Sequence, residues 1–267
     1  MSTFNLLLIA LIQGVTEFLP VSSSGHLILL PNLTGLADQG QIIDVAAHVG
    51  TLLAVILYFR TDVMIALGGL MRLVRGKVDT QGAFLALCLV IATVPVVLFG
   101  LFLKLTGVAD QMRSIAVIGW AMIIFGIVLY WADQKGPTNK ATEGWSLKDA
   151  FQMGLWQAIA LIPGTSRSGI TITAGRMLGY TRTDAARLSM LMSIPTIIAS
   201  GTLIGIDIAG PADASAIREI GIVVAMSFAA ALGALTLMMR LLRTVSFTPY
   251  VIYRIALGVV LLWIAYT

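Results

Sequence analysis

Charged side chains are scarce in this sequence of 267 residues. Asp, Glu, Lys and Arg make up 11% of it, against about 25% in a typical soluble domain. Hydrophobic residues make up 58%, and the mean hydropathy is +0.95. These values exclude an ordinary soluble protein and indicate an integral membrane protein. The apolar runs are continuous and do not alternate, so we expect membrane-spanning helices and no membrane β-barrel.

Cysteine and histidine are also rare, with one and two copies. The single cysteine, Cys88, lies in an apolar run and has no partner for an internal disulfide. No basic residue precedes Arg60, so the positive segment of a cleavable signal peptide is missing, and we expect none. The lysines and arginines behind the formal net charge of +4 are expected to set the membrane topology and to bind no nucleic acid.

Six apolar runs approach the roughly 20 residues that a helix needs to cross a bilayer. Four shorter runs form two pairs, and each pair surrounds a polar turn that contains proline and glycine. Two short helices joined by such a turn are typical of a re-entrant hairpin, which enters the membrane and returns to the same side. The expected spans are 42–59, 83–103, 114–131, 186–209, 217–239 and 250–266, and the paired runs are 4–19 with 26–36 and 151–162 with 169–180.

The two polar turns resemble each other when the chain is shifted by 144 residues. The residues that then coincide are Gln13 with Gln157, Ser22 with Ser166, Ser24 with Ser168, and Gly25 with Gly169. Two short Ser/Gly turns can also match by chance, but a second argument is independent of the match. Each hairpin is followed by three spans, and an odd number of spans makes the second copy start from the opposite face.

We therefore expect an all-α polytopic membrane protein with an inverted-topology repeat, six transmembrane helices and two re-entrant helix hairpins. Residues 1–267 form a single membrane domain in this interpretation. Repeat one covers about 1–131, a cytoplasmic linker about 132–150, and repeat two about 151–267.

Loop charge predicts the orientation, because lysine and arginine collect in cytoplasmic loops. The loops on one side of the membrane hold eleven of these residues, and the loops on the other side hold three. The side with eleven is expected to be cytoplasmic, which places both termini outside. The first hairpin then enters from outside and the second from the cytoplasm.

The first turn combines groups that are costly at membrane depth and are therefore candidates for function. Gln13 and Glu17 are four residues apart and share a helix face, and their oxygens suit a hard cation such as Mg²⁺ or Ca²⁺. A structural hydrogen bond or a helix cap is the alternative for Glu17. Ser22, Ser23 and Ser24 form a hydroxyl-rich turn before a helix, where anions bind, and the alternative is a plain capped loop.

Two further candidates complete the polar turns. His26 opens the helix after the first turn and can act as an acid, a base or a nucleophile. Arg167 lies between Ser166 and Ser168 in the second turn, with Thr171 shortly after, and its planar group matches phosphate oxygens. The alternative is an ion pair between Arg167 and Glu17 without a ligand. If the turns meet, one chamber contains the parts that phosphoryl transfer needs.

The two turns carry specific motifs. The first reads QGVTEFLPVSSSGH from Gln13 to His26, and the second reads PGTSRSGIT from Pro163 to Thr171. They resemble the (Glu/Gln)-x-x-x-Glu segment with its Pro-Val-Ser-Ser-x-Gly-His turn, and the Pro-Gly-x-Ser-Arg-Ser-Gly turn, of the bacterial undecaprenyl-diphosphate phosphatase family of bacitracin-resistance proteins. Weaker matches begin at Asp44 and Ala185, so that the resemblance covers nearly the whole chain.

This resemblance implies hydrolysis of undecaprenyl diphosphate to undecaprenyl phosphate and inorganic phosphate, aided by a divalent cation. The reaction would recycle the lipid carrier of cell-wall peptidoglycan and confer resistance to bacitracin. It would take place in the bacterial cytoplasmic (inner) membrane, at a site open to the outer, periplasmic face. The implied partners are this lipid and the surrounding membrane, and a homodimer is left open. A lipid-phosphate flippase or an anion transporter is the alternative function.

The resemblance also implies roles for individual residues. Glu17 and Gln13 become the metal-side acidic motif, Ser23 the nucleophile, His26 its acid/base partner, and Arg167 the diphosphate clamp. The expected substrate-binding hydroxyls are those of Ser22, Ser24, Ser166, Ser168 and Thr171. Whether serine, histidine or water attacks stays open, and the lipid tail is expected along 42–59 or 186–209. Two residues depart from the expected pattern: Arg176 replaces a small or apolar residue, and Asp44 is a shorter acid than the usual glutamate.

Overall fold

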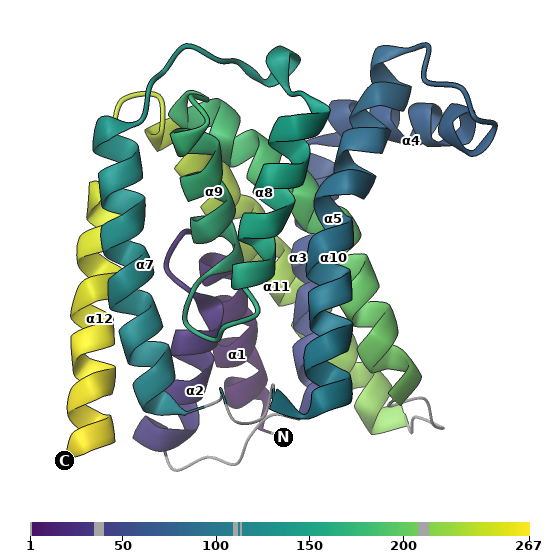
Figure 1. The fold of residues 1–267 in the computed structure, drawn as a ribbon. Helices are drawn as coiled ribbons and strands as arrows, with labels where there is room; N and C mark the ends of the chain where they lie inside the picture. Colours follow the sequence, from purple (N-terminus) through teal and green to yellow (C-terminus); the bar gives the residue numbers. More distant parts are fainter. Residues whose placement is uncertain (1, 35–39, 109–111, 113, 208–213) are drawn as a thin grey trace.

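The computed structural model of the chain describes residues 2–34, 40–108, 112, 114–207 and 214–267. Regular structure in these residues consists of eleven α-helices and one short 3-10 helix, η1 (Thr142–Gly144). The helices stand side by side in a bundle, with both termini at the same end (Figure 1). An all-α polytopic fold was predicted from the continuous apolar runs, and the structure confirms it.

Six of the helices are long and apolar enough to cross a membrane. Each corresponds to one of the six predicted spans, with ends that differ by a few residues. These helices are α3 (Gln41–Tyr58), α5 (Gln81–Thr106), α7 (Ile115–Lys135), α10 (Arg182–Asp207), α11 (Ala214–Leu241) and α12 (Thr248–Tyr266).

Four shorter helices form two hairpins that enter the bundle from opposite ends (Figure 1). The first hairpin consists of α1 (Thr3–Thr16) and α2 (Ser23–Thr34), and the second of α8 (Leu147–Ile159) and α9 (Arg167–Met177). At about 1.5 Å per residue, none of the four covers the thickness of a bilayer. The hairpins are present as predicted, and their re-entry into a membrane stays a prediction.

The backbone of the two hairpin turns supports the internal repeat. Ser22 and Ser166 coincide under the 144-residue shift, and both have a positive φ, 72° and 69°. No other non-glycine residue in the described ranges has a positive φ. Each of these serines also shares a hydrogen bond with the serine two positions later, Ser24 or Ser168, at 3.0 and 3.1 Å. The same unusual turn is therefore built twice, and the repeat boundaries stay a prediction.

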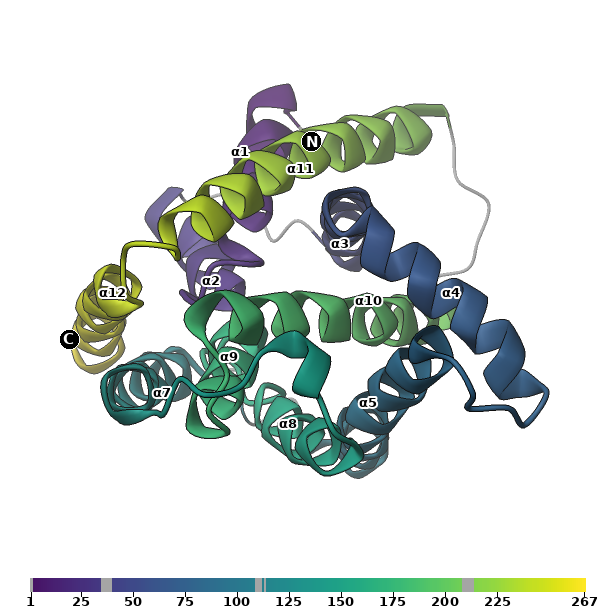
Figure 2. The same cartoon turned by 90° about the horizontal axis from the view of Figure 1, so that it is seen from above.

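One helix lies in residues 60–82, between the predicted spans 42–59 and 83–103, where only a loop was expected. Helix α4 (Arg60–Val74) crosses the end of the bundle beside α3, α5 and α10 (Figure 2). It packs closely on α5, since a Cβ added to Gly69 would lie 1.9 Å from the carbonyl carbon of Gly82. The described part of repeat two has no such helix, because α10 ends at Asp207 and α11 begins at Ala214.

Arg176, which departs from the expected pattern, holds the linker of residues 132–150 against α9. Its side chain is buried, and its Nε lies 3.3 Å from Asp133 Oδ1 at the end of α7. It also donates to carbonyl oxygens of Tyr180 and Gly136. A small residue at this position would leave these groups unpaired, so Arg176 is explained by the chain segments that surround it.

Candidate functional site

The two hairpin turns contact each other in the middle of the bundle. Ser168 Oγ donates to the carbonyl of Leu19 at 2.9 Å, and Ser24 Oγ accepts from the backbone N–H of Gly164 at 3.3 Å. The two serines coincide under the 144-residue shift, so equivalent residues of the two turns make the contact, one as a donor and the other as an acceptor. The sequence predicted the two turns separately, and the fold brings them together.

An ion pair joins the two hairpins at this contact. Arg167 Nη2 donates to Glu17 Oε1 at 2.7 Å, and only 13% and 8% of the two side chains are exposed. A second, longer contact at 3.4 Å leads from Arg167 to the carbonyl of Ser189. Guanidinium has five N–H donors, so these two contacts leave others for a ligand. The ion pair that the sequence analysis considered as an alternative is present, and it leaves room for anion binding.

A cavity of about 230 Å³ lies beside this ion pair. Side chains of both turns form its polar wall, and α3, α5 and α10 supply the rest. The polar residues that line it from the turns and from α3 are Glu17, Ser22, Ser23, Ser24, Ser166, Arg167 and His48. Most of the predicted site residues therefore face one cavity that contains an arginine, a carboxylate and several hydroxyls.

Ser23 lies close to a group that can accept its proton. Its Oγ donates to Glu17 Oε2 at 3.2 Å, while Arg167 occupies the other oxygen of the same carboxylate. A hydroxyl beside a carboxylate is one of the arrangements that activate a nucleophile. The geometry is consistent with Ser23 as the attacking group, which stays a prediction.

Gln13 supports Glu17 from within the same helix. It is fully buried, and its Nε2 donates to Glu17 Oε2 at 2.9 Å. Its Oε1 is buried without a hydrogen-bond partner. An unpartnered amide oxygen next to a carboxylate has the chemistry of a site for a hard cation. The described residues contain no group of three or more His, Cys, Asp or Glu side chains that could hold a metal ion, so Glu17 would need ligands of other kinds beside it.

His26 does not line this cavity. Its Nδ1 lies 2.7 Å from the carbonyl oxygen of Ser22, and its Nε2 lies 2.7 Å from Tyr253 Oη of α12. The ring also stacks on Tyr253, with 5.5 Å between the centroids. Both ring nitrogens are thus engaged, and its part as acid/base partner of Ser23 stays a prediction.

His48 is the histidine that faces the cavity, and the sequence analysis assigned it no role. Its Nε2 lies 3.1 Å from Gln13 Nε2 and 3.8 Å from Glu17 Oε2. Its Nδ1 lies 2.8 Å from the carbonyl of Asp44, which favours the tautomer with the proton on Nδ1. Nε2 is then an acceptor beside the site. Its position could have indicated a role, because His48 lies in the predicted span that directly follows the first hairpin.

Arg254 of α12 was also missed, and it holds both turns from behind. It is 0% exposed. Its Nη2 donates to the carbonyls of Gly164 and Thr165 at 3.1 and 2.8 Å, and its Nη1 to the carbonyl of Pro20 at 3.4 Å. Its Nε donates to the carbonyl of Met122 at 3.0 Å. Placing a charged side chain inside a membrane span costs free energy, so such an arginine is a candidate for function by default. Arg254 could therefore have been identified as a candidate from the sequence.

Replacing Arg254 with methionine is expected to lower the free energy of unfolding by about 3 kcal/mol or more. The change leaves carbonyl groups of both turns buried and unpaired, and each such group costs roughly 1–3 kcal/mol. Thermal unfolding in detergent measures the loss as a lower Tm. Arg243→Met, at an exposed position after α11, is the control and should leave Tm almost unchanged. Equal Tm values for the two variants would show that Arg254 does not hold the turns.

Two predicted substrate-binding hydroxyls lie behind the polar wall of the cavity. Thr171 Oγ1 is buried and contacts the carbonyl of Arg167 at 2.8 Å and Ser189 Oγ at 2.6 Å. Ser168 is also fully buried and is used in the contact with Leu19. In this structure they support the second turn, and their contact with a substrate stays a prediction.

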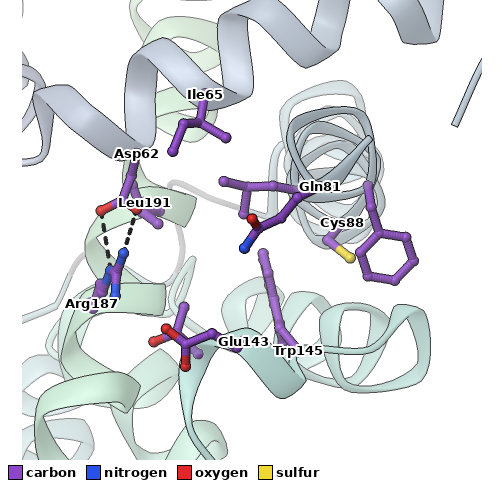
Figure 3. Close-up of a pocket in the computed structure, with 11 residues that line it drawn as sticks. Asp62, Ile65, Gln81, Cys88, Glu143, Trp145, Arg187 and Leu191 are labelled. Carbon is purple, nitrogen blue, oxygen red and sulfur yellow. Dashed lines mark hydrogen bonds and ion pairs between the residues drawn. The ribbon is translucent and has the colours of Figure 1, made fainter. Parts of the chain in front are cut away.

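A second cavity, of about 110 Å³, lies near α4 (Figure 3). Arg187 of α10 and Asp62 of α4 form an ion pair in its wall, with Arg187 Nε 3.1 Å from Asp62 Oδ2. Gln81 of α5 and Thr142, Glu143 and Trp145 of the linker also line it. None of the predicted site residues lines this cavity, so it is separate from the candidate site, and its ion pair anchors α4 to α10.

Comparison with known proteins gives consistent matches along the whole chain. The family described as bacitracin resistance protein BacA matches residues 6–260. The chain is 67% identical over 267 residues to an undecaprenyl-diphosphatase of Dinoroseobacter shibae, with all of both chains covered. It is 67% identical over 266 residues to that of Jannaschia sp., again covering 100% of both chains. It is 44% identical over 265 residues to that of Maricaulis maris, covering 98% of each chain.

Proposed function

The chain belongs to the bacitracin resistance protein BacA family, and from this membership we infer that it is an integral membrane undecaprenyl-diphosphatase. It hydrolyses undecaprenyl diphosphate to undecaprenyl phosphate and inorganic phosphate, which recycles the lipid carrier of the cell wall and confers resistance to bacitracin. One observation carries the chemistry. The carboxylate of Glu17 and the guanidinium of Arg167 come from opposite hairpins and meet at one cavity, beside the hydroxyl of Ser23.

The proposed first step is attack on the terminal phosphorus by Ser23 Oγ. Its proton passes to Glu17 Oε2, which lies 3.2 Å away. The new Oγ–P bond forms while the bond to the bridging oxygen breaks, and undecaprenyl phosphate leaves. Arg167 binds the phosphate oxygens and stabilises the charge that develops on them. The hydroxyls of Ser22, Ser24 and Ser166 line the same cavity and orient the phosphate.

The second step is hydrolysis of the phosphoserine by water, which restores Ser23. His26 is the proposed acid/base residue implied by the family resemblance. Because its ring contacts the Ser22 carbonyl and Tyr253, it acts either through a water molecule or after a rotation of the ring. Ser168 and Thr171 support Arg167 from behind in this proposal.

A divalent cation, Mg²⁺ or Ca²⁺, fits the donors on the Glu17 side of the cavity. Glu17 and the unpartnered Oε1 of Gln13 would hold it together with phosphate oxygens and water. When bound, the cation would neutralise phosphate charge. Without a cation, Gln13 orients the Glu17 carboxylate through its Nε2.

We also propose that the protein lies in the bacterial cytoplasmic membrane with both termini outside. Lys and Arg residues of the predicted cytoplasmic loops collect at the end of the bundle that carries α4 and the linker, opposite the termini (Figure 1). The first hairpin then enters from the outer face, and the cavity opens to that face. A homodimer remains part of the proposal, and the mass of the purified protein in detergent tests it.

Release of inorganic phosphate from undecaprenyl diphosphate, by the purified protein in detergent, tests the function directly. We expect release that stops on addition of a chelator and returns when Mg²⁺ or Ca²⁺ is restored in excess. The flippase or transporter needs two compartments and releases no phosphate in a micelle, so absence of release would favour that alternative. Release that persists in chelator would contradict the cation and leave the hydrolase in place.

A further inference from the structure

His48 of α3 lies beside Glu17 and Gln13 of the first hairpin, and the proposed reaction steps do not use it. Its Nε2 lies 3.1 Å from Gln13 Nε2 and 3.8 Å from Glu17 Oε2. Gln13 Nε2 lies 2.9 Å from the same carboxylate oxygen. Three polar groups from two hairpin and span segments therefore form a small triangle. Glu17 and His48 both line the candidate cavity, so a small ligand in the cavity can reach this triangle.

The ring of His48 is oriented as a metal ligand would be. Its Nδ1 lies 2.8 Å from the backbone carbonyl oxygen of Asp44, which can only accept a hydrogen bond. The proton of the neutral ring is therefore on Nδ1, and Nε2 has a free lone pair directed at the triangle. Histidines that bind metal ions usually donate their other ring N–H to a carbonyl or a carboxylate in this way.

The side-chain amide of Gln13 can present either of its two ends to the triangle. In the structure its Nε2 faces Glu17 Oε2 and His48 Nε2, while its Oε1 is buried without a hydrogen-bond partner. The terminal torsion of glutamine is roughly two-fold, so a half-turn exchanges the two atoms. Three acceptors would then surround one point, and a cation between them would stabilise this arrangement. Without a cation, the N–H groups of the amide supply the missing positive charge.

The spacing of the three positions suits one small divalent ion. Ligands about 2.1 Å from an octahedrally coordinated ion lie about 3 Å apart at neighbouring positions and about 4 Å apart at opposite positions. The three separations in the triangle are 2.9, 3.1 and 3.8 Å. The donors are therefore close enough to share one ion without a movement of the backbone.

The packing of α11 fixes the distance between the two helices that carry these donors. Helix α11 lies beside both α1 and α3 (Figure 2). A Cβ added to Gly14, which follows Gln13, would lie 2.7 Å from the carbonyl oxygen of Ser227 in α11. A Cβ added to Gly50, two residues after His48, would collide with the hydroxyl of the same serine. Glycine thus lets both helices pack closely on one position of α11, which holds their donors in place.

We propose that His48 Nε2 is a direct ligand of the divalent cation, together with Glu17 Oε2 and Gln13 Oε1. The inference rests on the proposed function and adds a nitrogen donor to the two oxygen donors named there. Imidazole favours transition-metal ions, whereas Ca²⁺ prefers ligands that are all oxygen. The site is therefore expected to bind Mn²⁺ more tightly than Ca²⁺, and His48 is the residue that produces this preference.

The test measures metal binding separately from activity. The purified protein, without a histidine tag, is loaded with Mn²⁺ in detergent, and pulsed electron paramagnetic resonance detects an imidazole nitrogen bound to the ion. We expect this coupling in the wild type and not in His48→Gln, which keeps an oxygen donor but lacks the ring. In calorimetric titrations, His48→Gln should weaken Mn²⁺ binding about ten-fold or more and change Ca²⁺ binding by less than about three-fold.

His26→Gln is the matched control, because His26 is the other of the two histidines in the chain and does not line the cavity. This variant should keep the imidazole coupling and the Mn²⁺ affinity of the wild type. The inference is wrong if the wild type shows no imidazole coupling, or if His26→Gln loses it. Both measurements remain decisive if His48→Gln does not fold.

Phosphate release by the same wild-type preparation distinguishes this inference from the proposed function. Release without an imidazole coupling would leave the function in place and show that His48 only orients Gln13. An imidazole coupling without release from undecaprenyl diphosphate would leave the metal site in place and contradict the function.

Discussion

Arg167→Lys is expected to lower kcat/KM for undecaprenyl diphosphate about 100-fold or more, although the positive charge is kept. In the structure one guanidinium contacts Glu17 at 2.7 Å and still has N–H groups for the cavity. Lysine has one compact ammonium group, which cannot hold the carboxylate and bind two phosphate oxygens in a fixed geometry. Phosphate release in detergent measures the loss.

Arg182→Lys is the matched control for this prediction. Arg182 also pairs with a carboxylate, with Nε 2.7 Å from Asp133 Oδ1, but it lies at the linker end of α10. The control should retain activity close to that of the wild type, with a similar Tm. Near-normal turnover by a folded Arg167→Lys variant would show that charge alone suffices and that the clamp geometry is wrong.

Ser23→Ala is expected to reduce turnover about 1000-fold or more, while the lipid diphosphate still binds. Ser23 Oγ is the hydroxyl of the first turn that donates to Glu17, whereas Arg167 and the remaining hydroxyls of the cavity are unchanged. Turnover is measured as phosphate release, and binding as equilibrium retention of labelled lipid. The two measurements separate loss of the nucleophile from loss of the site.

Ser193→Ala provides the control, because this serine is fully buried in α10 and donates to the carbonyl of Met190. It should leave both turnover and binding close to the wild type. Substantial activity in Ser23→Ala would exclude the serine as nucleophile and transfer the attack to His26 or to water. Loss of binding together with turnover would instead show that Ser23 contacts the phosphate in the ground state.

The six spans and the two hairpins could be predicted because their signals lie within single segments. A span is defined by its own apolar residues, and a hairpin by short apolar runs around a turn such as QGVTEFLPVSSSGH. The match of Ser22 with Ser166 required comparison of two segments but no knowledge of contacts, and both residues have the same unusual backbone. Helix α4 was missed because its uncharged run, residues 63–71, is too short for a span and lies between Asp62 and Arg72, so that it was interpreted as a loop.

The partners of the site residues could not be predicted in the same way. His26 has the expected place in the first turn, yet its ring contacts Tyr253, which is 227 residues away in the sequence. His48 faces the cavity, and Arg254 binds carbonyls of both turns, because α3 and α12 pack where they do. These contacts depend on how the side chains of several helices pack together, and a pattern within one short segment does not contain that information.

The amino-acid sequence by itself determined that the protein is a helical membrane protein, with two polar turns whose residues suit phosphate and a cation. These properties follow from the hydropathy and chemistry of short segments. Only the tertiary structure decided that Glu17 meets Arg167, that His48 lines the cavity, and that Arg254 holds both turns. The physical reason is that such contacts join residues far apart in the chain, where one glycine or isoleucine changes how closely two helices approach.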